Sequence, residues 1–239
     1  MTSYVVIFFI ILIGSTIHGT TGFGFSLFVM PLLTLLLPVK TTTIVVLNLV
    51  FILVTIIFFR MKRHINIQLI KYVILGSISG RTAGFLILER LNNDILQTVL
   101  GVVLIIISIY FIFYSTTIKT RPTMLKGIVA GIISGILGGI YNIGGPPLVL
   151  FFLSATEDKK EYQASLQAVF MIVSLYSILL HNLYGNYNYQ VLKLTFFGVV
   201  PVVLGSILGG YIFTRINLGI IKKSIYYLIA FLGIMIILK

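Results

Sequence analysis

The sequence has no cysteine and few charged residues, and each shortage excludes a class of protein. Without cysteine, the chain forms no disulfide and no thiolate metal site. Charged residues make up 9% of the 239 residues, against roughly 25% in a soluble domain. Because 17 basic and 5 acidic side chains cannot cover a particle of 26.6 kDa, a water-soluble protein is excluded. The hydrophobic share of 59% and the mean hydropathy of +1.14 place nearly the whole chain in a lipid bilayer.

Acidic residues are scarcer than basic ones, and the net charge is +12. The basic residues lie in short runs between apolar segments, which is typical of membrane-anchored loops rather than of a nucleic-acid-binding face. We therefore expect membrane lipid, and no nucleic acid, as a partner. The first residues, MTSYVVIFFI, lack the basic start of a signal peptide, so we expect a retained membrane segment.

Six apolar segments have the length of about 20 residues that a membrane-crossing helix needs. They span residues 42–59, 68–88, 95–116, 162–182, 192–213 and 220–238. Two further stretches, 4–37 and 126–155, are longer, and a glycine-rich run interrupts each near its middle. The runs read HGTTGFG from His18 and GGIYNIGGPP from Gly138. In a helix interior glycine costs roughly 1 kcal/mol and proline about 3 kcal/mol, so both runs predict breaks.

Each interrupted stretch either crosses the membrane once or folds back as a hairpin, and the placement of lysine and arginine favours the hairpin. If both stretches return to their starting side, twelve basic residues lie on one side of the membrane and four on the other. If both cross, the split is nine to seven. Because basic residues concentrate in cytoplasmic loops, we expect two hairpins and a cytoplasmic Arg60–Arg63 loop.

The two halves of the chain resemble each other. The matched pairs, in chain order, are Gly19 with Gly139, Gly24 with Gly144, Asn48 with Gln167, and LGSISG from residue 75 with LGSILG from residue 204. We therefore predict an all-α integral membrane protein of two inverted repeats, residues 1–118 and 119–239, each a broken-helix hairpin followed by three transmembrane helices. Secondary transporters share this architecture and bind substrate near the membrane midplane.

The polar residues inside the apolar segments indicate an anionic substrate. Acidic residues lie only in or next to loops, whereas a transported cation needs carboxylates inside the membrane. Arg81 is the one permanent charge well inside a span. In the hairpin arrangement, the helices that begin near Ser26 and Pro146 point their N-termini at the membrane centre. Each N-terminus offers unpaired N–H groups and about half a positive charge, which favour an anion.

We predict that these groups form one substrate site. The planar fork of Arg81 matches sulfonate, sulfite or carboxylate oxygens, and glycine lets the backbone approach a ligand closely. Structural roles are the alternative: Arg81 can cap carbonyls, and Asn48 and Gln167 can hold helices together. The predicted substrate-binding residues are Thr20, Thr21, Gly22, Gly24, Ser26, Asn48, Arg81, Tyr141, Asn142, Gly144, Gly145 and Gln167.

Motifs of nucleotide, zinc and hydrolase sites are missing, since the sequence contains no GxxxxGK[ST], HExxH or GxSxG. We therefore expect no enzymatic activity, no cofactor and no metal, and a driving force taken from ion or substrate gradients. His18 is expected to be the only titratable group of neutral range within the membrane, which makes it the candidate for proton coupling. Its alternative role is donation to a backbone carbonyl.

The segments GTTGFGFSLFVMPLLTLLLP and GILGGIYNIGGPPLVLFFL resemble the two signature regions of the TauE/SafE family of sulfite exporters, also called TSUP. The repeated LGSxxG stretches are similar to that family as well. The resemblance implies a multi-pass protein of the prokaryotic inner membrane. It also implies export or uptake of a small sulfur-containing anion such as sulfite or a sulfoacetate-like organosulfonate. We expect a secondary transporter that exports this anion by alternating access. The breaks at 19–26 and 139–147 would line the site.

Two other functions stay open beside a proton-linked secondary transporter of a small anion. A passive anion channel would use the same donors without mobile halves. A non-transporting membrane scaffold would need no anion site, and it would leave the matched glycine breaks unexplained.

Overall fold

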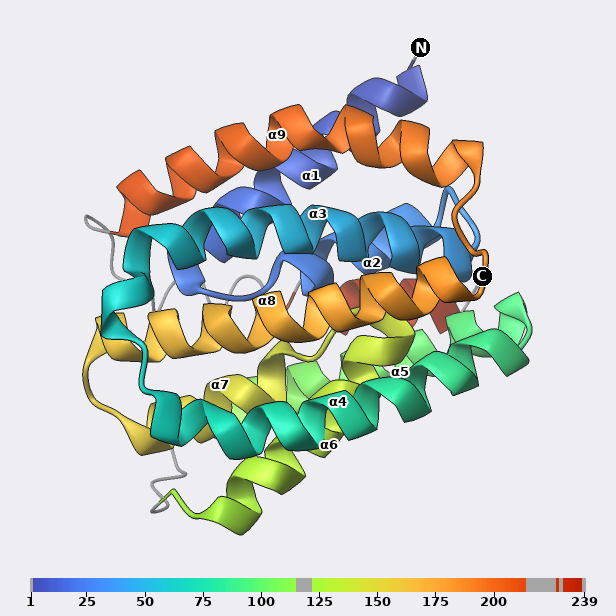
Figure 1. Ribbon diagram of the computed structural model, residues 1–239. Coiled ribbons are helices and arrows are strands. Elements are labelled where there is room, and N and C mark those ends of the chain that lie inside the picture. The colour runs from blue at the N-terminus through green and yellow to red at the C-terminus, as the bar shows by residue number, and fades with distance from the viewer. Residues whose placement is uncertain (1, 115–121, 214–226, 228–229, 238–239) are drawn as a thin grey trace.

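The computed structural model describes residues 2–114, 122–213, 227 and 230–237, and the regular structure in this part of the chain is helical (Figure 1). This confirms the all-α fold class. Residues 230–237 form a helix that packs on α5, where Gly233 and Ile237 lie against Gly101. The other elements are α1 (Thr2–Thr21), α2 (Phe25–Thr34), α3 (Val39–Met61), the 3-10 turn η1 (Lys62–His64), α4 (Ile67–Arg90), α5 (Asn93–Tyr114), α6 (Met124–Tyr141), α7 (Gly145–Ala155), α8 (Lys159–Leu183) and α9 (Tyr189–Phe213).

The predicted spans correspond to long helices. Segments 42–59, 68–88, 162–182 and 192–213 lie within α3, α4, α8 and α9, and 95–116 lies in α5 as far as residue 114. Outside residues 227 and 230–237, the segment 220–238 falls beyond the described residues. Six described helices are long and apolar enough to cross a membrane, namely α1, α3, α5, α6, α8 and α9. Helix α4 is 24 residues long and is more polar, because it carries Lys71, Arg81, Glu89 and Arg90.

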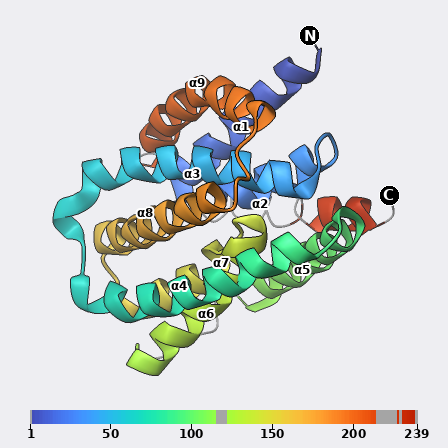
Figure 2. The same ribbon diagram turned by 45° about the vertical axis from the view of Figure 1, so that its right-hand side comes forward.

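The first interrupted stretch reverses direction, so that α2 runs back toward the end where α1 began (Figures 1 and 2). At the start of α1, Tyr4 packs on Phe197 near the start of α9. At the end of α2, the carbonyl of Thr34 accepts a hydrogen bond from Gln97 near the start of α5, at 3.3 Å. Both ends of this hairpin therefore lie beside the α4–α5 and α8–α9 turns.

The second interrupted stretch also reverses, and it starts and finishes at the other end of the molecule (Figure 1). Gly127, in the first turn of α6, lies against Tyr72 near the start of α4. Helix α7 ends at Ala155, just before α8, and Glu161 in the first turn of α8 accepts a hydrogen bond from Asn66 at 2.8 Å. Each stretch thus returns to its starting end, as a hairpin does.

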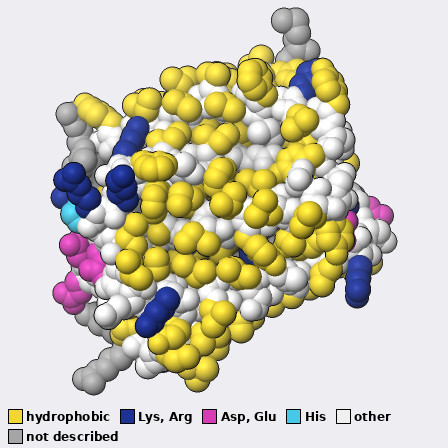
Figure 3. Space-filling model, in the orientation of Figure 1, with side chains coloured by type: hydrophobic (Ala, Val, Ile, Leu, Met, Phe, Trp, Pro, Cys, Tyr) yellow, Lys and Arg dark blue, Asp and Glu magenta, His cyan; other side chains and the backbone are white. Residues whose placement is uncertain are grey.

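Charged side chains gather at the two ends of the molecule, and a hydrophobic face lies between them (Figure 3). We call the end at η1 and the α7–α8 turn the basic end, because it carries Arg60, Lys62, Arg63, Lys159 and Lys160. The opposite end, at the α4–α5 and α8–α9 turns, carries Lys40, Arg90 and Lys193. This distribution favours a cytoplasmic basic end.

Single cysteines can test this orientation, because the natural chain contains none. Glu157 at the basic end and Gln190 at the opposite end are both exposed. In intact cells, a membrane-impermeant maleimide is expected to label Gln190→Cys at once and Glu157→Cys only after permeabilisation. The reverse labelling pattern would contradict the orientation.

Two closely packed helix pairs flank the bundle, and α2, α3, α7 and α8 lie between them (Figure 1). The α4–α6 contact is the most extensive and the α1–α9 contact is the next. Both depend on glycine: a methyl group at Gly135 would lie 2.8 Å from Gly80 Cα, and one at Gly19 would lie 3.1 Å from Gly209 Cα. Such small residues let helix backbones meet.

The packing also bears on the predicted repeats. Helix α1 in the first half matches α6 in the second half, and α4 matches α9. The α1–α9 contact therefore corresponds to the α6–α4 contact with the two halves exchanged. This correspondence favours two inverted repeats. The division at residues 118 and 119 lies outside the described residues, and the repeat relation stays a prediction.

A candidate anion site between two helix breaks

The first break joins α1 to α2 through a backbone that needs glycine. Gly22 has φ +82° and Gly24 has φ +104°, a region that side chains with a Cβ rarely enter. The hydroxyl of Thr21 donates to the carbonyl of Phe23 and holds the connection. Because α2 starts at Phe25, directly after Gly24, its N-terminus lies at the break.

The second break uses asparagine where the first uses glycine. Asn142 has φ +58° and follows the last residue of α6. The N–H of Asn142 donates to the carbonyl of Gly138 at 2.9 Å, which closes the helix end in an αL motif. Asn142 lies 120 positions after Gly22, which is also left-handed. Asparagine tolerates this conformation better than most residues, and here it adds a side chain that glycine lacks.

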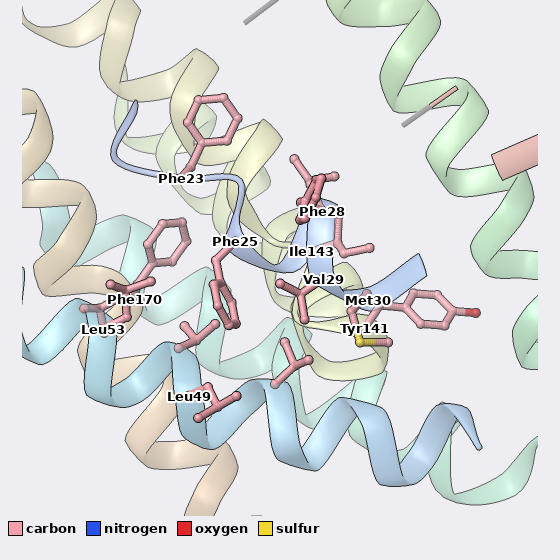
Figure 4. Close-up of a cluster of buried hydrophobic side chains, with 14 of the residues drawn as sticks. Phe23, Phe25, Phe28, Val29, Met30, Leu49, Leu53, Tyr141, Ile143 and Phe170 are labelled. Atoms are coloured by element: carbon pink, nitrogen blue, oxygen red, sulfur yellow. The ribbon is translucent and has the colours of Figure 1, made fainter. Parts of the chain in front are cut away.

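A small cavity lies between the two breaks. It offers about 20 Å³ of room for the centre of a water molecule, somewhat more than the roughly 10–15 Å³ that one water needs. Figure 4 shows part of the apolar wall, with Phe23 on the first break and Phe170 on α8. The lining residues are His18, Phe23, Gly24, Ser26, Leu27, Val50, Arg81, Asn142, Ile143, Gly145 and Phe170.

Arg81 brings a full positive charge to this cavity from the middle of α4. It is 4% exposed, and its Nη1 donates to Asn142 Oδ1 at 3.1 Å and to Ser177 Oγ at 3.0 Å. Its Nε has no hydrogen-bond partner. Within the described part of the chain no carboxylate pairs with Arg81. A buried cation without a counter-ion costs several kcal/mol, by order of magnitude.

Asn142 is held in one orientation by its second hydrogen bond. Its Nδ2 donates to the carbonyl of Thr43 at 2.7 Å, so its Oδ1 faces Arg81. The hydroxyl of Thr43 in turn donates to the carbonyl of Ile140 at 2.9 Å. These bonds join α3, α4 and the second break, and they fix the guanidinium at the cavity wall.

His18 borders the cavity from the last turn of α1. Its Nε2 lies 3.1 Å from Gln167 Oε1, and Gln167 Nε2 donates to the carbonyl of Gly22 at 2.7 Å. Because the amide oxygen can only accept, His18 Nε2 carries the proton of this bond. Gln167 thereby connects His18 to the first break.

The N-termini of α2 and α7 meet the same cavity. Gly24, which precedes α2, and Gly145, which begins α7, both line it. Neither helix start has a side-chain cap. The first N–H groups of a helix have no partner within the helix, so α2 presents several donors. In α7, Pro146 and Pro147 have no N–H, which leaves the N–H of Gly145 as the donor of the first three residues. Both starts carry partial positive charge.

The structure brings some of the predicted site residues together and places the others elsewhere. Those that line the cavity are His18, Gly24, Ser26, Arg81, Asn142 and Gly145. The others make structural contacts. Four donate to backbone carbonyls: Thr20 to those of Thr16 and Gly209, Thr21 to that of Phe23, Tyr141 to that of Leu96, and Gln167 to that of Gly22. The side chain of Asn48 bonds Thr195 and Tyr187, and the carbonyl of Gly144 accepts a hydrogen bond from Ser134.

Several residues at the site were not predicted. Phe23 and Ile143 lie inside the predicted breaks, so their position along the chain could have indicated them. Nothing in the local sequence marks Val50, Phe170 or Ser177, because each lies in an apolar helix. The expectation that His18 is the only titratable group of neutral range inside the membrane is wrong, since His181 is also buried, at 1% exposure.

The arrangement suits a small anion. One guanidinium and two helix N-termini offer positive charge or donors, and no acidic side chain is among the described residues that line the cavity. No group of three or more histidine, cysteine, aspartate or glutamate residues that could hold a metal ion occurs among the described residues.

Comparisons with known proteins agree with this reading. The model of the family described as Sulfite exporter TauE/SafE matches residues 6–236. Searches of curated proteins and of solved structures gave no match. The family match covers nearly the whole chain, and the helices have the length and composition of membrane spans. The chain is therefore a multi-pass integral membrane protein that belongs to the TauE/SafE family of sulfite exporters.

Proposed function

We propose that this protein is a secondary transporter, not an enzyme, that exports a small sulfur-containing anion, sulfite or an organosulfonate, by alternating access. The observation that carries this proposal is Arg81, a buried guanidinium that faces a cavity between two helix N-termini with no carboxylate partner among the described residues. An anion bound there supplies the missing counter-charge.

The geometry of the guanidinium favours an oxyanion. Nη1 is occupied by Asn142 and Ser177, while Nε on the other edge has no partner. The Nε–Nη2 edge packs against Gly138 of α6, and once that contact opens it can bind two oxygens of one sulfonate or sulfite group. Since the cavity has room for about one water molecule, it must widen to admit sulfite or a sulfonate, and the smaller ion requires less widening.

The two breaks supply a means of movement. Hairpins that begin at opposite ends of the molecule meet at the cavity, and short helices α2 and α7 can move relative to the long helices around the left-handed residues at each break. Broken helices at the substrate site are typical of secondary transporters. His18, at the cavity wall, is the candidate that would link anion movement to protons.

Thermal unfolding of the detergent-purified protein with a panel of anions tests the proposal. The panel holds sulfite, sulfoacetate, taurine, thiosulfate, sulfate, lactate and chloride. A ligand at 100 times its Kd stabilises the native state by about 2.7 kcal/mol, so sulfite or a sulfonate is expected to raise Tm selectively. Equal stabilisation by chloride and lactate would contradict a sulfur-anion site.

Liposome counterflow separates a carrier from a channel. Liposomes that are loaded with unlabelled sulfite and contain a carrier accumulate labelled sulfite transiently, and the rate of uptake saturates as the sulfite concentration rises. A passive channel shows neither behaviour, and a non-transporting scaffold shows no flux at all.

A further inference from the structure

Helix α4 makes three successive contacts, two with α8 and one with the α8–α9 turn, that lead from the cavity to the opposite end of the molecule. Arg81 bonds Ser177 at the cavity wall. One turn further along both helices, the ring of Phe85 packs edge-on against His181, with 4.9 Å between ring centroids. One turn beyond that, Glu89 accepts a hydrogen bond from Asn186. The contacts therefore join a buried histidine to the anion site on one side and to a carboxylate near the surface on the other.

The hydrogen bonds around His181 define its neutral form. Asn186 Nδ2 lies 3.1 Å from His181 Nδ1 and donates to Glu89 Oε1 at 2.7 Å. One amide nitrogen carries two hydrogens, so it can donate to both partners. His181 Nδ1 then accepts, and the ring proton is on Nε2. A proton arriving at Nδ1 breaks the bond to Asn186 unless the amide turns its oxygen toward the ring.

The charges that face His181 come from two helices. They are the carboxylate of Glu89 on α4 and the cations Lys40 on α3 and Arg81 on α4. Glu89 is itself paired with Lys40 at 2.6 Å, and its side chain is 18% exposed, so it connects with solvent at the opposite end. His18 has no such connection: its contacts are Gln167 and the ring of Phe170, and no carboxylate is among them.

We propose that His181 is a proton site coupled to the anion site, filled from the opposite end past Glu89 and linked to the bound anion through Ser177 and Arg81. This inference rests on the proposed function, because it requires an anion at Arg81. The proton comes from water at the opposite end and binds His181 Nδ1 as the Asn186 amide turns its oxygen toward the ring, and the ionised Glu89 carboxylate beside Asn186 compensates the positive charge of the ring.

The sign of the coupling follows from the charges. With an empty cavity, a charged His181 is repelled by Arg81. An anion beside Arg81 compensates that charge and attracts the charged ring, so anion binding promotes proton binding. By linkage, proton binding strengthens anion binding by the same factor.

The test is the Kd of sulfite for the purified full-length protein between about pH 5.5 and 8.5, the range in which histidine changes charge. Sulfite itself titrates here, but identically for every variant, so differences between variants report the protein. We expect wild type and His181→Gln to bind alike at the alkaline end. As the pH falls, the wild type should gain affinity over His181→Gln by up to about tenfold per pH unit, the limit for one coupled proton.

Two further variants control the test. His64 lies in η1 at the basic end and is exposed, so His64→Gln is expected to follow the wild-type curve. Glu89→Gln keeps an acceptor for Asn186 and loses the charge, so the rise in affinity should begin at lower pH. If His181→Gln does not fold, the test depends on Glu89→Gln. If the Kd of sulfite for Glu89→Gln then has the same pH dependence as for the wild type, the proposal is wrong.

Other outcomes are also decisive. If His181→Gln follows the wild type at every pH, or differs from it by a constant factor, His181 has only a structural role and the proposal is wrong. If the wild type binds no sulfite at any pH, the sulfite site itself fails and the coupling proposal falls with it.

Discussion

Replacing Arg81 by glutamine should remove the anion site and leave a folded protein. A hydrogen bond to a charged group contributes about 1.5–3 kcal/mol, and 1.4 kcal/mol corresponds to about a tenfold change in Kd. We therefore expect Arg81→Gln to weaken sulfite binding about 10- to 100-fold. The measurement is the sulfite-dependent rise in Tm, which should be much smaller than that of the wild type at the same sulfite concentration.

The stability of the protein without ligand separates this role from a structural one. Removing a buried cation that has no counter-ion relieves an unfavourable charge, so the Tm of ligand-free Arg81→Gln should equal or exceed that of the wild type. If Arg81 only holds Asn142 and Ser177 in place, the variant will instead have a lower Tm and an unchanged Kd for sulfite.

Two related substitutions make the test sharper. Arg81→Lys keeps the charge but loses the planar fork, so its affinity for sulfite should lie between those of wild type and Arg81→Gln. Asn142→Asp keeps Arg81 and places a carboxylate where Oδ1 now lies 3.1 Å from Nη1. That internal counter-ion should displace sulfite, with Arg81 itself intact.

The fold was largely predictable because membrane burial leaves strong marks on a sequence. A span of about 20 apolar residues is conspicuous, and the charge count distinguished hairpins from single crossings. Both interrupted stretches reverse direction (Figure 1), and the described helices that correspond to predicted spans begin and end within a few residues of the predicted limits, as far as these lie in the described part of the chain. The breaks were predictable for a related reason, since Gly22 and Gly24 adopt a backbone conformation that other residues rarely adopt.

The site was predictable only where a residue is unusual for its surroundings. Arg81 is a charge inside an apolar helix, and such a residue indicates a function. Asn48 and Gln167 were predicted as a pair because they match in the two halves, but their partners differ. Asn48 bonds Thr195 and Tyr187, whereas Gln167 bonds His18 and Gly22. Residues at matching positions in the two halves occupy corresponding places in the backbone, but their side chains have different neighbours.

Residues such as Ser177, Phe170 and His181 could not be assigned from the sequence, because they lie on α8, where apolar residues occur on most faces. In a soluble helix, the polar face separates exposed from buried positions. In a membrane helix, lipid-facing and protein-facing residues are both apolar, so the inward face becomes visible only once the helices are packed together.

A side chain at Gly80 should prevent α4 and α6 from pairing, and this is the largest stability effect that we expect. A methyl group at Gly80 would overlap the carbonyl oxygen of Ile132 and lie 3.0 Å from Gly135 Cα. Backbone atoms cannot yield as a flexible side chain can. Alanine gains about 1 kcal/mol of helix propensity over glycine, but overpacking costs typically 1–3 kcal/mol or more, so Gly80→Ala should lower Tm. Gly80→Leu should prevent folding.

The adjacent Ser79 provides the matched control for this helix pair. It is exposed on α4, on the side turned away from α6, so Ser79→Leu adds the same side chain without meeting another helix. We expect Ser79→Leu to elute as one sharp peak in detergent with a wild-type Tm, and Gly80→Leu to aggregate. Because α4 and α6 place Arg81 beside Gly138 and Asn142, Gly80→Ala should also weaken sulfite binding. A native Tm for Gly80→Leu would show that the two backbones do not approach each other this closely.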